Sequence, residues 1–347
     1  MTDQILISSS PQIHAPLSTR RVMVAVLLAL VPAGLWSFYL FGLRSLAVIG
    51  ASVAAAMVTE GLLNLVFHRK QSLGDLSAAV TGLLVAYNMP PAIPLYIPVV
   101  ASVFAIAVVK WSFGGLGANW MNPALAGRVF VFFSWGKDMA HWTLPSVTGL
   151  DAITRPSLME ADVVSGPTPL GSVKVALSHL PQGVDGPMRL LESEGMPTSY
   201  LDLFLGRMAG SLGEMSAMLI LLGGVVLILM RIVDWRIPLA YLASFSLLVW
   251  CFDGLQYGMG FFTGDVLFQL LTGGLMLGAF FMATDMPTTP LTGTGKLIFA
   301  LGCGILTFVI RRFGNLPEGV SLAIIFMNIW VPLIDRWTKP SRYGASA

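Results

Sequence analysis

The feature that most constrains this chain is a series of ten apolar runs, separated by polar connections. An α-helix needs about 20 apolar residues to cross the hydrocarbon core of a bilayer, and in lipid only helices or closed barrels satisfy every backbone hydrogen bond. The sequence therefore predicts an all-α polytopic membrane protein with spans near residues 22–41, 45–67, 76–89, 93–110, 123–135, 213–231, 237–252, 266–283, 297–310 and 319–334. Several runs are short and carry Gly or Pro near one end, so we expect those near residues 80, 125, 275 and 320 to be broken or tilted.

Composition excludes several classes of function. Charged residues make up 11% of the chain, against about 25% in soluble domains, and no basic cluster suits nucleic acid. The four histidines are scattered without metal-ligand spacing, and the two thiols, Cys251 and Cys303, cannot alone ligate an iron–sulfur cluster. We expect no metal site in this chain, no nucleic-acid partner and, because no A-x-A-like site follows a short apolar core, no removable signal peptide.

Lysine and arginine in the short connections predict the orientation. Cationic connections stay preferentially in the cytoplasm, and with ten spans most of these residues fall on the side of both termini: Arg20, Arg21, Arg69, Lys70, Lys110, Arg231, Arg236, Lys296, Arg336, Lys339 and Arg342. Arg311 and Arg312, after the ninth run, are the exception. The sequence predicts cytoplasmic termini and a periplasmic central segment.

An internal repeat divides the chain. "TGLLVAYNMPP" (81–91) is echoed by "LGAFFMATDMPTTP" (277–290), and "FGGLGANWMNPALAG" (113–127) more faintly by "RRFGNLPEGVSLA" (311–323), about 195 residues apart in both cases. Chance similarity between apolar segments is the alternative, but the matching order and separation argue against it. Five spans per half is an odd number, so the halves are expected to be inverted relative to each other, with small-molecule sites at their interface.

The repeat predicts five parts of the chain. They are a cytoplasmic tail (1–21), a first five-helix repeat (22–135), a periplasmic loop (136–212), a second five-helix repeat (213–337) and a cytoplasmic tail (338–347).

The central polar stretch "ADVVSGPTPLGSVK" (161–174) contains an unusual turn sequence. Its glycine and prolines favour a turn, expected to be exposed. Local spacing gives Thr168 no base, so it lacks the activation that a nucleophile needs. Thr168 is either a plain turn residue, or its hydroxyl is the acceptor of a group that a separate enzyme attaches.

Asp162-x-x-Ser165-Gly166-Pro167-Thr168 is similar to the D-x-x-[ST]-G-A-T pattern on which a flavin transferase esterifies FMN to the Thr; the usual Ala is Pro167 here. With ten spans in two halves, and the stretches "GANWMNPALAGR" and "MATDMPTTPLTG", the chain resembles the D-subunit family of Rnf ion-translocating electron-transport complexes. That family is related to the B subunit of the Na+-pumping NADH:quinone oxidoreductase.

The resemblance implies covalent FMN on Thr168, with Asp162, Ser165 and Gly166 as its attachment motif. It further implies partner membrane subunits and flavin and iron–sulfur subunits in a bacterial inner membrane. The chain would then be one subunit of a Na+- or H+-translocating enzyme, inactive in isolation.

The resemblance also implies a second, non-covalent flavin, riboflavin, inside the membrane region. Asn119, Asn122 and the glycines around them would allow the backbone to approach a flat ring closely.

Ionisable and polar residues within the spans are candidates for an ion path because burial in lipid is costly. Glu60 and Asn64 lie one turn apart on the same helix face, with an interhelical hydrogen bond as the alternative. Asn88 and Asp285 occupy equivalent positions in the two repeats, as half-sites or as plain helix caps. Arg128, one turn after Pro123, is expected to snorkel toward the cytoplasmic face.

Two other functions fit the same spans. One is an inverted-repeat secondary transporter without a redox cofactor, in which 136–212 is only a connector. The other is a cofactor-free scaffold subunit.

Overall fold

The computed structural model describes residues 18–69, 71–143, 167–179, 186–193, 199–314 and 318–339. Within these ranges it is all-helical, with fifteen α-helices, several short 3-10 and π-helical turns and no β-strand. Three residues of the attachment motif, Asp162, Ser165 and Gly166, lie outside them. The all-helical architecture predicted from the apolar runs is confirmed.

Each of the ten apolar runs contains helix. The first five form α1 (Thr19–Phe41), α2 (Leu43–Val66), α3 (Ser77–Tyr87), α4 (Tyr96–Phe104) with the π-helix η2 (Ala105–Trp111), and α5 (Pro123–Ser134). The last five form α11 (Ala217–Leu229), α12 (Arg236–Phe252), α13 (Val266–Leu271) with α14 (Leu275–Leu277) and the π-helix η5 (Gly278–Met282), α15 (Gly293–Phe313) and α16 (Val320–Trp337). In the described ranges five helical segments are long and apolar enough to cross a membrane: α1, α2, α12 with the turn after it, α15 and α16. The chain is a multi-pass membrane protein.

Of the four spans predicted to be broken or tilted, one is broken and two contain short helices. α3 has 11 residues and α5 has 12, while the run 266–283 breaks at Gly273 and Gly274, both in the left-handed region with φ of 67° and 65°. The span near residue 320 is not broken, because α16 is continuous over 18 residues. Its helix-breaking glycine, Gly319, precedes the first turn rather than interrupting the helix.

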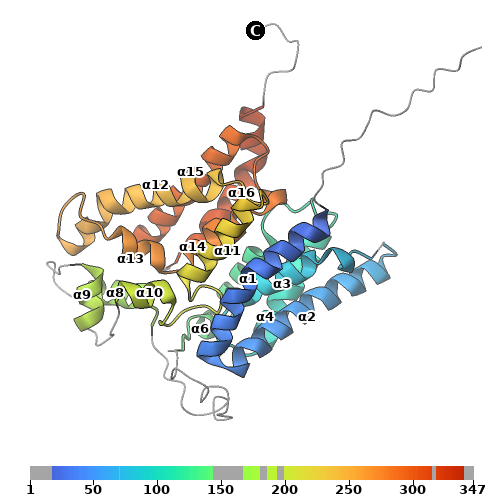
Figure 1. The fold of residues 1–347 in the computed structure, drawn as a ribbon, viewed down its shortest axis with the longest axis horizontal. Helices are drawn as coiled ribbons and strands as arrows, with labels where there is room; N and C mark the ends of the chain where they lie inside the picture. Colours follow the sequence, from blue (N-terminus) through green and yellow to red (C-terminus); the bar gives the residue numbers. More distant parts are fainter. Residues whose placement is uncertain are drawn as a thin grey trace, which may run out of the picture.

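The helices form two groups, blue to cyan and yellow to red in Figure 1. In the first group α2 packs on α3 and α4, and in the second α12 packs on α15, which packs on α16. The groups meet where α1 packs on α11 and α5 on α16. Glycines allow close approach at these contacts, as is common between helices in membranes; a Cβ on Gly223 of α11 would lie 2.4 Å from the Ala29 carbonyl oxygen of α1.

The central segment 136–212, expected to be a loop, contains short helices in its described parts: α6 (Gly136–Met139), α8 (Pro169–His179), α9 (Pro187–Ser193) and α10 (Tyr200–Leu205). α8, α9, α10 and α13 share a small apolar core that includes Leu170, Leu190, Leu203 and Phe268. In Figure 1 these central helices lie toward the lower edge, whereas the start of α1 and the end of α16 lie toward the upper edge.

Among the described residues, two of the cations considered for orientation, Lys110 and Arg311, are buried. Lys110 lies in η2 and is buried. Arg311 is also buried, and its guanidinium donates to the carbonyl oxygens of Gln269 (2.7 Å), Thr272 (2.9 Å) and Gly273 (3.1 Å). These carbonyls lie at and just before the break after α13, where backbone acceptors lack helical partners and carry partial negative charge. Arg311 is therefore an exception to the pattern of cations in cytoplasmic connections, because its guanidinium binds carbonyl groups at the break after α13.

Candidate functional site

Thr168 immediately precedes α8 and caps its N-terminus. Its Oγ1 accepts a hydrogen bond from the Gly171 N–H at 3.1 Å, and its carbonyl accepts one from the Ser172 N–H at 2.8 Å. Thr168 is 8% exposed, so the expectation of an exposed turn is wrong for this residue. The N-terminus of a helix carries partial positive charge and free N–H groups, which favour phosphate.

α8 lies against the junction between α13 and α15. Leu170 reaches Gly273, where a Cβ would lie 3.2 Å from the leucine Cδ2 and 2.8 Å from Nη2 of Arg311. Lys174 donates to the carbonyl oxygens of Arg311 and Gly314, and burial lowers the pKa of its ammonium. Thr168 therefore lies two residues before Leu170, which reaches Gly273 beside the Arg311 guanidinium.

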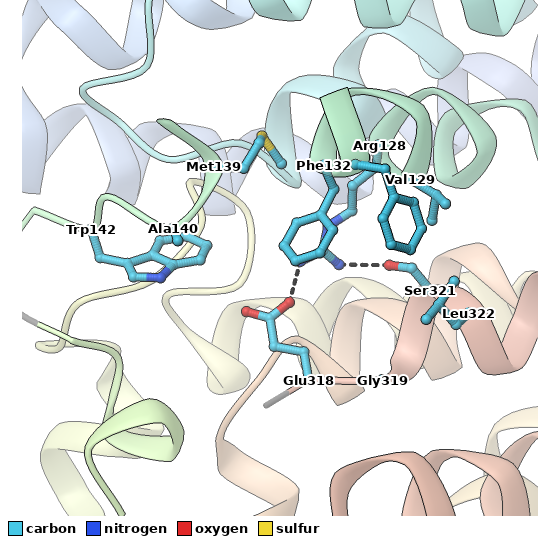
Figure 2. A pocket seen from close by; sticks show the side chains of 11 residues that line it. Arg128, Val129, Phe132, Met139, Ala140, Trp142, Glu318, Gly319, Ser321 and Leu322 are labelled. Carbon is cyan, nitrogen blue, oxygen red and sulfur yellow. Dashed lines mark hydrogen bonds and ion pairs between the residues drawn. The ribbon is translucent and has the colours of Figure 1, made fainter. Parts of the chain in front are cut away.

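A cavity lies between α5, the segment after α6 and the start of α16 (Figure 2). Its apolar wall includes Phe132, Phe133, Met139 and Trp142. We call it the aromatic cavity.

Arg128 forms the polar wall of the aromatic cavity. Its guanidinium pairs with Glu318, donates to the Ser321 hydroxyl at 2.6 Å, and lies 3.7 Å from Glu214 Oε1. Figure 2 shows it pointing toward Glu318 and Ser321. The prediction that Arg128 snorkels to the cytoplasmic face is wrong: Arg128 is buried, and two carboxylates with side-chain exposures of 7% and 13% hold its charge inside the protein.

A second cavity lies where the two groups of helices meet; we call it the central cavity. It is lined by residues of both groups, including Lys110, Leu116, Asn119, Asn122, Thr284 and Asp285. Asn119 is 8% exposed, and its buried Oδ1 has no hydrogen-bond partner among the described residues. Such an atom is costly to bury unless a ligand or water satisfies it.

Asn122, by contrast, forms hydrogen bonds through both its Oδ1 and its Nδ2. Its Oδ1 caps α5 by accepting from the N–H groups of Ala124 (3.0 Å) and Leu125 (3.2 Å), and its Nδ2 donates to the Met282 carbonyl at 3.1 Å. It therefore shapes the central cavity, while Asn119 offers a free acceptor.

Glu60 and Asn64 are brought together by a third residue. The Ser72 hydroxyl donates to Glu60 Oε1 and accepts from Asn64 Nδ2 at 2.9 Å. Glu60 Oε2 pairs with the Lys110 ammonium at 2.5 Å, which also donates to the Ser77 hydroxyl at 2.6 Å. A third cavity, which we call the carboxylate cavity, has Glu60, Asn64, Ser72 and Lys110 in its wall.

Asn88 and Asp285 both occupy cap positions. Asn88 ends α3 and donates from Nδ2 to the Leu84 carbonyl at 2.6 Å. Asp285 precedes the 3-10 turn η6 (Met286–Thr288) and accepts from the Thr288 hydroxyl at 3.2 Å. Asp285 lines the central cavity, so the two equivalent positions differ in what they face.

Sequence reasoning missed Lys110, Ser77, Glu214 and Glu318 as partners in these clusters. Lys110 ends an apolar run, which makes it resemble a residue of a connection. No local pattern pairs it with Glu60, 50 residues away. In the described part of the chain no group of three or more His, Cys, Asp or Glu side chains could hold a metal ion.

The sequence matches the model of the NQR2, RnfD, RnfE family over residues 6–344. The chain belongs to this family. Among relatives, it is 41% identical over 339 residues to the D subunit of the proton-translocating ferredoxin:NAD(+) oxidoreductase complex of Clostridium ljungdahlii, covering 97% of this chain and 96% of that protein. It is 40% identical over 347 residues to the D subunit of the Na(+)-translocating ferredoxin:NAD(+) oxidoreductase complex of Acetobacterium woodii, covering 99% and 96%.

A third family member, the D subunit of the ion-translocating oxidoreductase complex of Stutzerimonas stutzeri, is 39% identical over 343 residues, covering 95% of this chain and 93% of that protein. The resemblance drawn from the Thr168 motif and the ten apolar runs is therefore confirmed at the level of the family.

Proposed function

We propose that this chain is a membrane subunit of an ion-translocating ferredoxin:NAD+ oxidoreductase complex, and that it carries FMN esterified to Thr168. Relatives of about 40% identity over nearly the whole chain bear the names of such subunits. The observation that carries the cofactor assignment is Thr168 at the N-cap of α8, in the Asp162-x-x-Ser165-Gly166-Pro167-Thr168 sequence.

The geometry of Thr168 is compatible with a phosphoester. The hydrogen bond from Gly171 uses an Oγ1 lone pair, and esterification removes only the hydroxyl hydrogen, so the cap is kept. The N–H groups and dipole of α8 would then stabilise the phosphate charge. FMN supplies the electron-transfer chemistry when bound, and the protein positions it and tunes its surroundings.

The aromatic cavity is our candidate site for the FMN ring. The backbone carbonyl of Glu318, in the wall of this cavity, accepts a hydrogen bond from Arg311 Nε at 2.9 Å. Arg311 and Leu170 both approach Gly273, and Leu170 is two residues after Thr168. Flat aromatic side chains suit an isoalloxazine ring.

For the fold we propose ten spans as two inverted five-helix repeats, 22–135 and 213–337, with 1–21 and 338–347 in the bacterial cytoplasm and 136–212 periplasmic. The two groups of helices support this division, as do the central helices opposite the start of α1 and the end of α16 (Figure 1).

We assign the second, non-covalent flavin, riboflavin, to the central cavity. The unpartnered Asn119 Oδ1 would accept a ring N–H, and Asn122 would position the wall. For the Na+ or H+ path we assign Glu60, Asn64, Asn88 and Asp285, because Glu60 and Asn64 border the carboxylate cavity and Asp285 the central cavity. Electrons would pass to and from other membrane, flavin and iron–sulfur subunits, and a flavin transferase would load Thr168.

In-gel flavin fluorescence after denaturation tests the covalent cofactor, with the transferase co-expressed. We expect a fluorescent band for the wild type and none for Thr168→Asp, which retains a capping oxygen but cannot form the ester. The same chain expressed without the transferase serves as the control. Fluorescence that survives Thr168→Asp would place the flavin elsewhere, and a dark wild-type band would favour the transporter or scaffold.

A further inference from the structure

Lys110 forms part of the wall of both the carboxylate cavity and the central cavity. It lies in the π-helix η2 and is 2% exposed. π-Helical turns within α-helices are frequent at functional sites. The ammonium group therefore occupies the boundary between a buried carboxylate and the proposed riboflavin cavity.

The surroundings of this ammonium are built from oxygen atoms. Glu60 Oε2 lies at 2.5 Å and Ser77 Oγ at 2.6 Å. Ser72 orients the other carboxylate oxygen, and Asp75 Oδ1 accepts from the Ser77 hydroxyl at 2.6 Å. Carboxylate and hydroxyl oxygens at these distances are also what a small hard cation prefers.

A lysine can leave such a position more readily than an arginine can. Its ammonium is a compact charge on a flexible four-carbon stem, with three rotatable donors. The hydrogen bonds to Glu60 and Ser77 use two of those donors. The central cavity beside it contains the unpartnered Asn119 Oδ1 and the Asp285 carboxylate in its wall, both hydrogen-bond acceptors.

We propose that the Lys110 ammonium is a tethered counter-ion that occupies a Na+ site formed by Glu60, Ser72 and Ser77, and that it vacates this site toward the central cavity.

This proposal connects electron transfer to ion binding through charge balance, and that link rests on the proposed second flavin. An electron taken up in the central cavity without a proton adds one negative charge there. Lys110 moves toward that charge with its proton retained, which leaves the Glu60 carboxylate uncompensated. One Na+ entering through the carboxylate cavity restores neutrality, and return of Lys110 after oxidation expels it. No covalent bond forms or breaks in this step.

The site is tested without any flavin by removing the tethered cation. A ligand that binds only the folded state raises its stability with concentration. We measure the Tm of the full chain in detergent as NaCl replaces KCl at constant ionic strength. The Tm of Lys110→Gln is expected to rise with Na+ concentration. The Tm of the wild type and of Lys110→Arg, which keep a cation in the site, is expected to stay unchanged. In Lys110→Gln/Glu60→Gln the Na+ response is expected to disappear because the carboxylate is gone.

If folded Lys110→Gln shows no Na+-specific rise in Tm, the proposed Na+ site is wrong. An equal rise in Tm in Lys110→Gln/Glu60→Gln would also overturn it. A second measurement needs no variant: binding of 22Na+ to the flavin-loaded wild type is expected to increase on reduction with dithionite. Equal binding in both redox states would overturn the coupling. Both measurements are repeated in Thr168→Asp, which lacks the covalent flavin and leaves Lys110, Glu60 and the central cavity intact, so that failure of the site is distinguishable from failure of the covalent cofactor.

Discussion

Arg128 of α5 and Glu318, just before α16, form an ion pair between the two groups of helices, with side-chain exposures of 8% and 13%. A second carboxylate, Glu214, lies 3.7 Å from the same guanidinium. One cation at the wall of the aromatic cavity therefore compensates two acidic groups, and removing the cation should cost more than removing either acid.

We expect Arg128→Met to destabilise the protein by about 3–5 kcal/mol, because two carboxylates lose their buried partner. Glu318→Gln should cost less, since Arg128 keeps Glu214 and the hydrogen bond to Ser321. Thermal unfolding in detergent checks the order, and the double variant Arg128→Met/Glu318→Gln should lose less than the sum of the single changes. Additive losses would show that the two residues do not interact.

Thr168 is expected to have separable roles in capping and in cofactor attachment. Thr168→Val removes the oxygen that accepts from Gly171 and should cost about 1 kcal/mol. Thr168→Asp restores an acceptor and favourable negative charge at the start of α8, so its stability should match that of the cofactor-free wild type. Tm values of chains expressed without the transferase make this comparison, and equal losses in both variants would argue against the cap.

Gly82 and Gly50 provide a matched pair on neighbouring helices. A Cβ on Gly82 of α3 would lie 2.7 Å from the Val53 Cα and 2.9 Å from the Ser52 carbonyl oxygen of α2. Gly82→Ala should therefore cost roughly 1–3 kcal/mol by forcing the helices apart. Gly50 in α2 has nothing within 4 Å of its Cβ position, so Gly50→Ala should be neutral or stabilising, by up to about 1 kcal/mol. Similar Tm values for the two alanine variants would contradict the packing of α2 on α3.

Asp234, between α11 and α12, should give a modest pH dependence. Burial raises the pKa of its carboxyl, but the hydrogen bonds and charges of Lys296 and Arg236 outweigh burial and lower it below the ordinary value. The ionised form is thus favoured in the folded state, so its stabilisation is present above about pH 4 and is lost as the pH falls through the lowered pKa.

Because the Lys296–Asp234 pair at 2.9 Å is about a quarter exposed, Asp234→Asn should cost only about 0.5 kcal/mol at pH 7. The difference in Tm from the wild type should shrink below pH 4. A difference that grows on acidification would reverse the sign assigned to this carboxyl.

Sequence patterns predicted the features that depend on neighbours along the chain. The length and hydrophobicity of the runs predicted the helices, because the backbone in lipid must form its own hydrogen bonds and a helix forms them between residues close in sequence. Short runs with Gly or Pro near one end predicted a break near residue 275, and the structure places it at Gly273 and Gly274, which adopt left-handed backbone. The motif ending at Thr168 was recognisable because its residues lie within seven positions.

Only the tertiary structure decided which charges compensate one another. Lys110 meets Glu60 from 50 residues away, and Arg128 meets Glu318 from 190 residues away. From the sequence, Lys110 was assigned to a connection and Arg128 was expected to extend toward the membrane surface, because an isolated cationic head group is more stable in water than in lipid. A buried partner removes that tendency, and a partner so distant in sequence is brought close only when the two groups of helices pack.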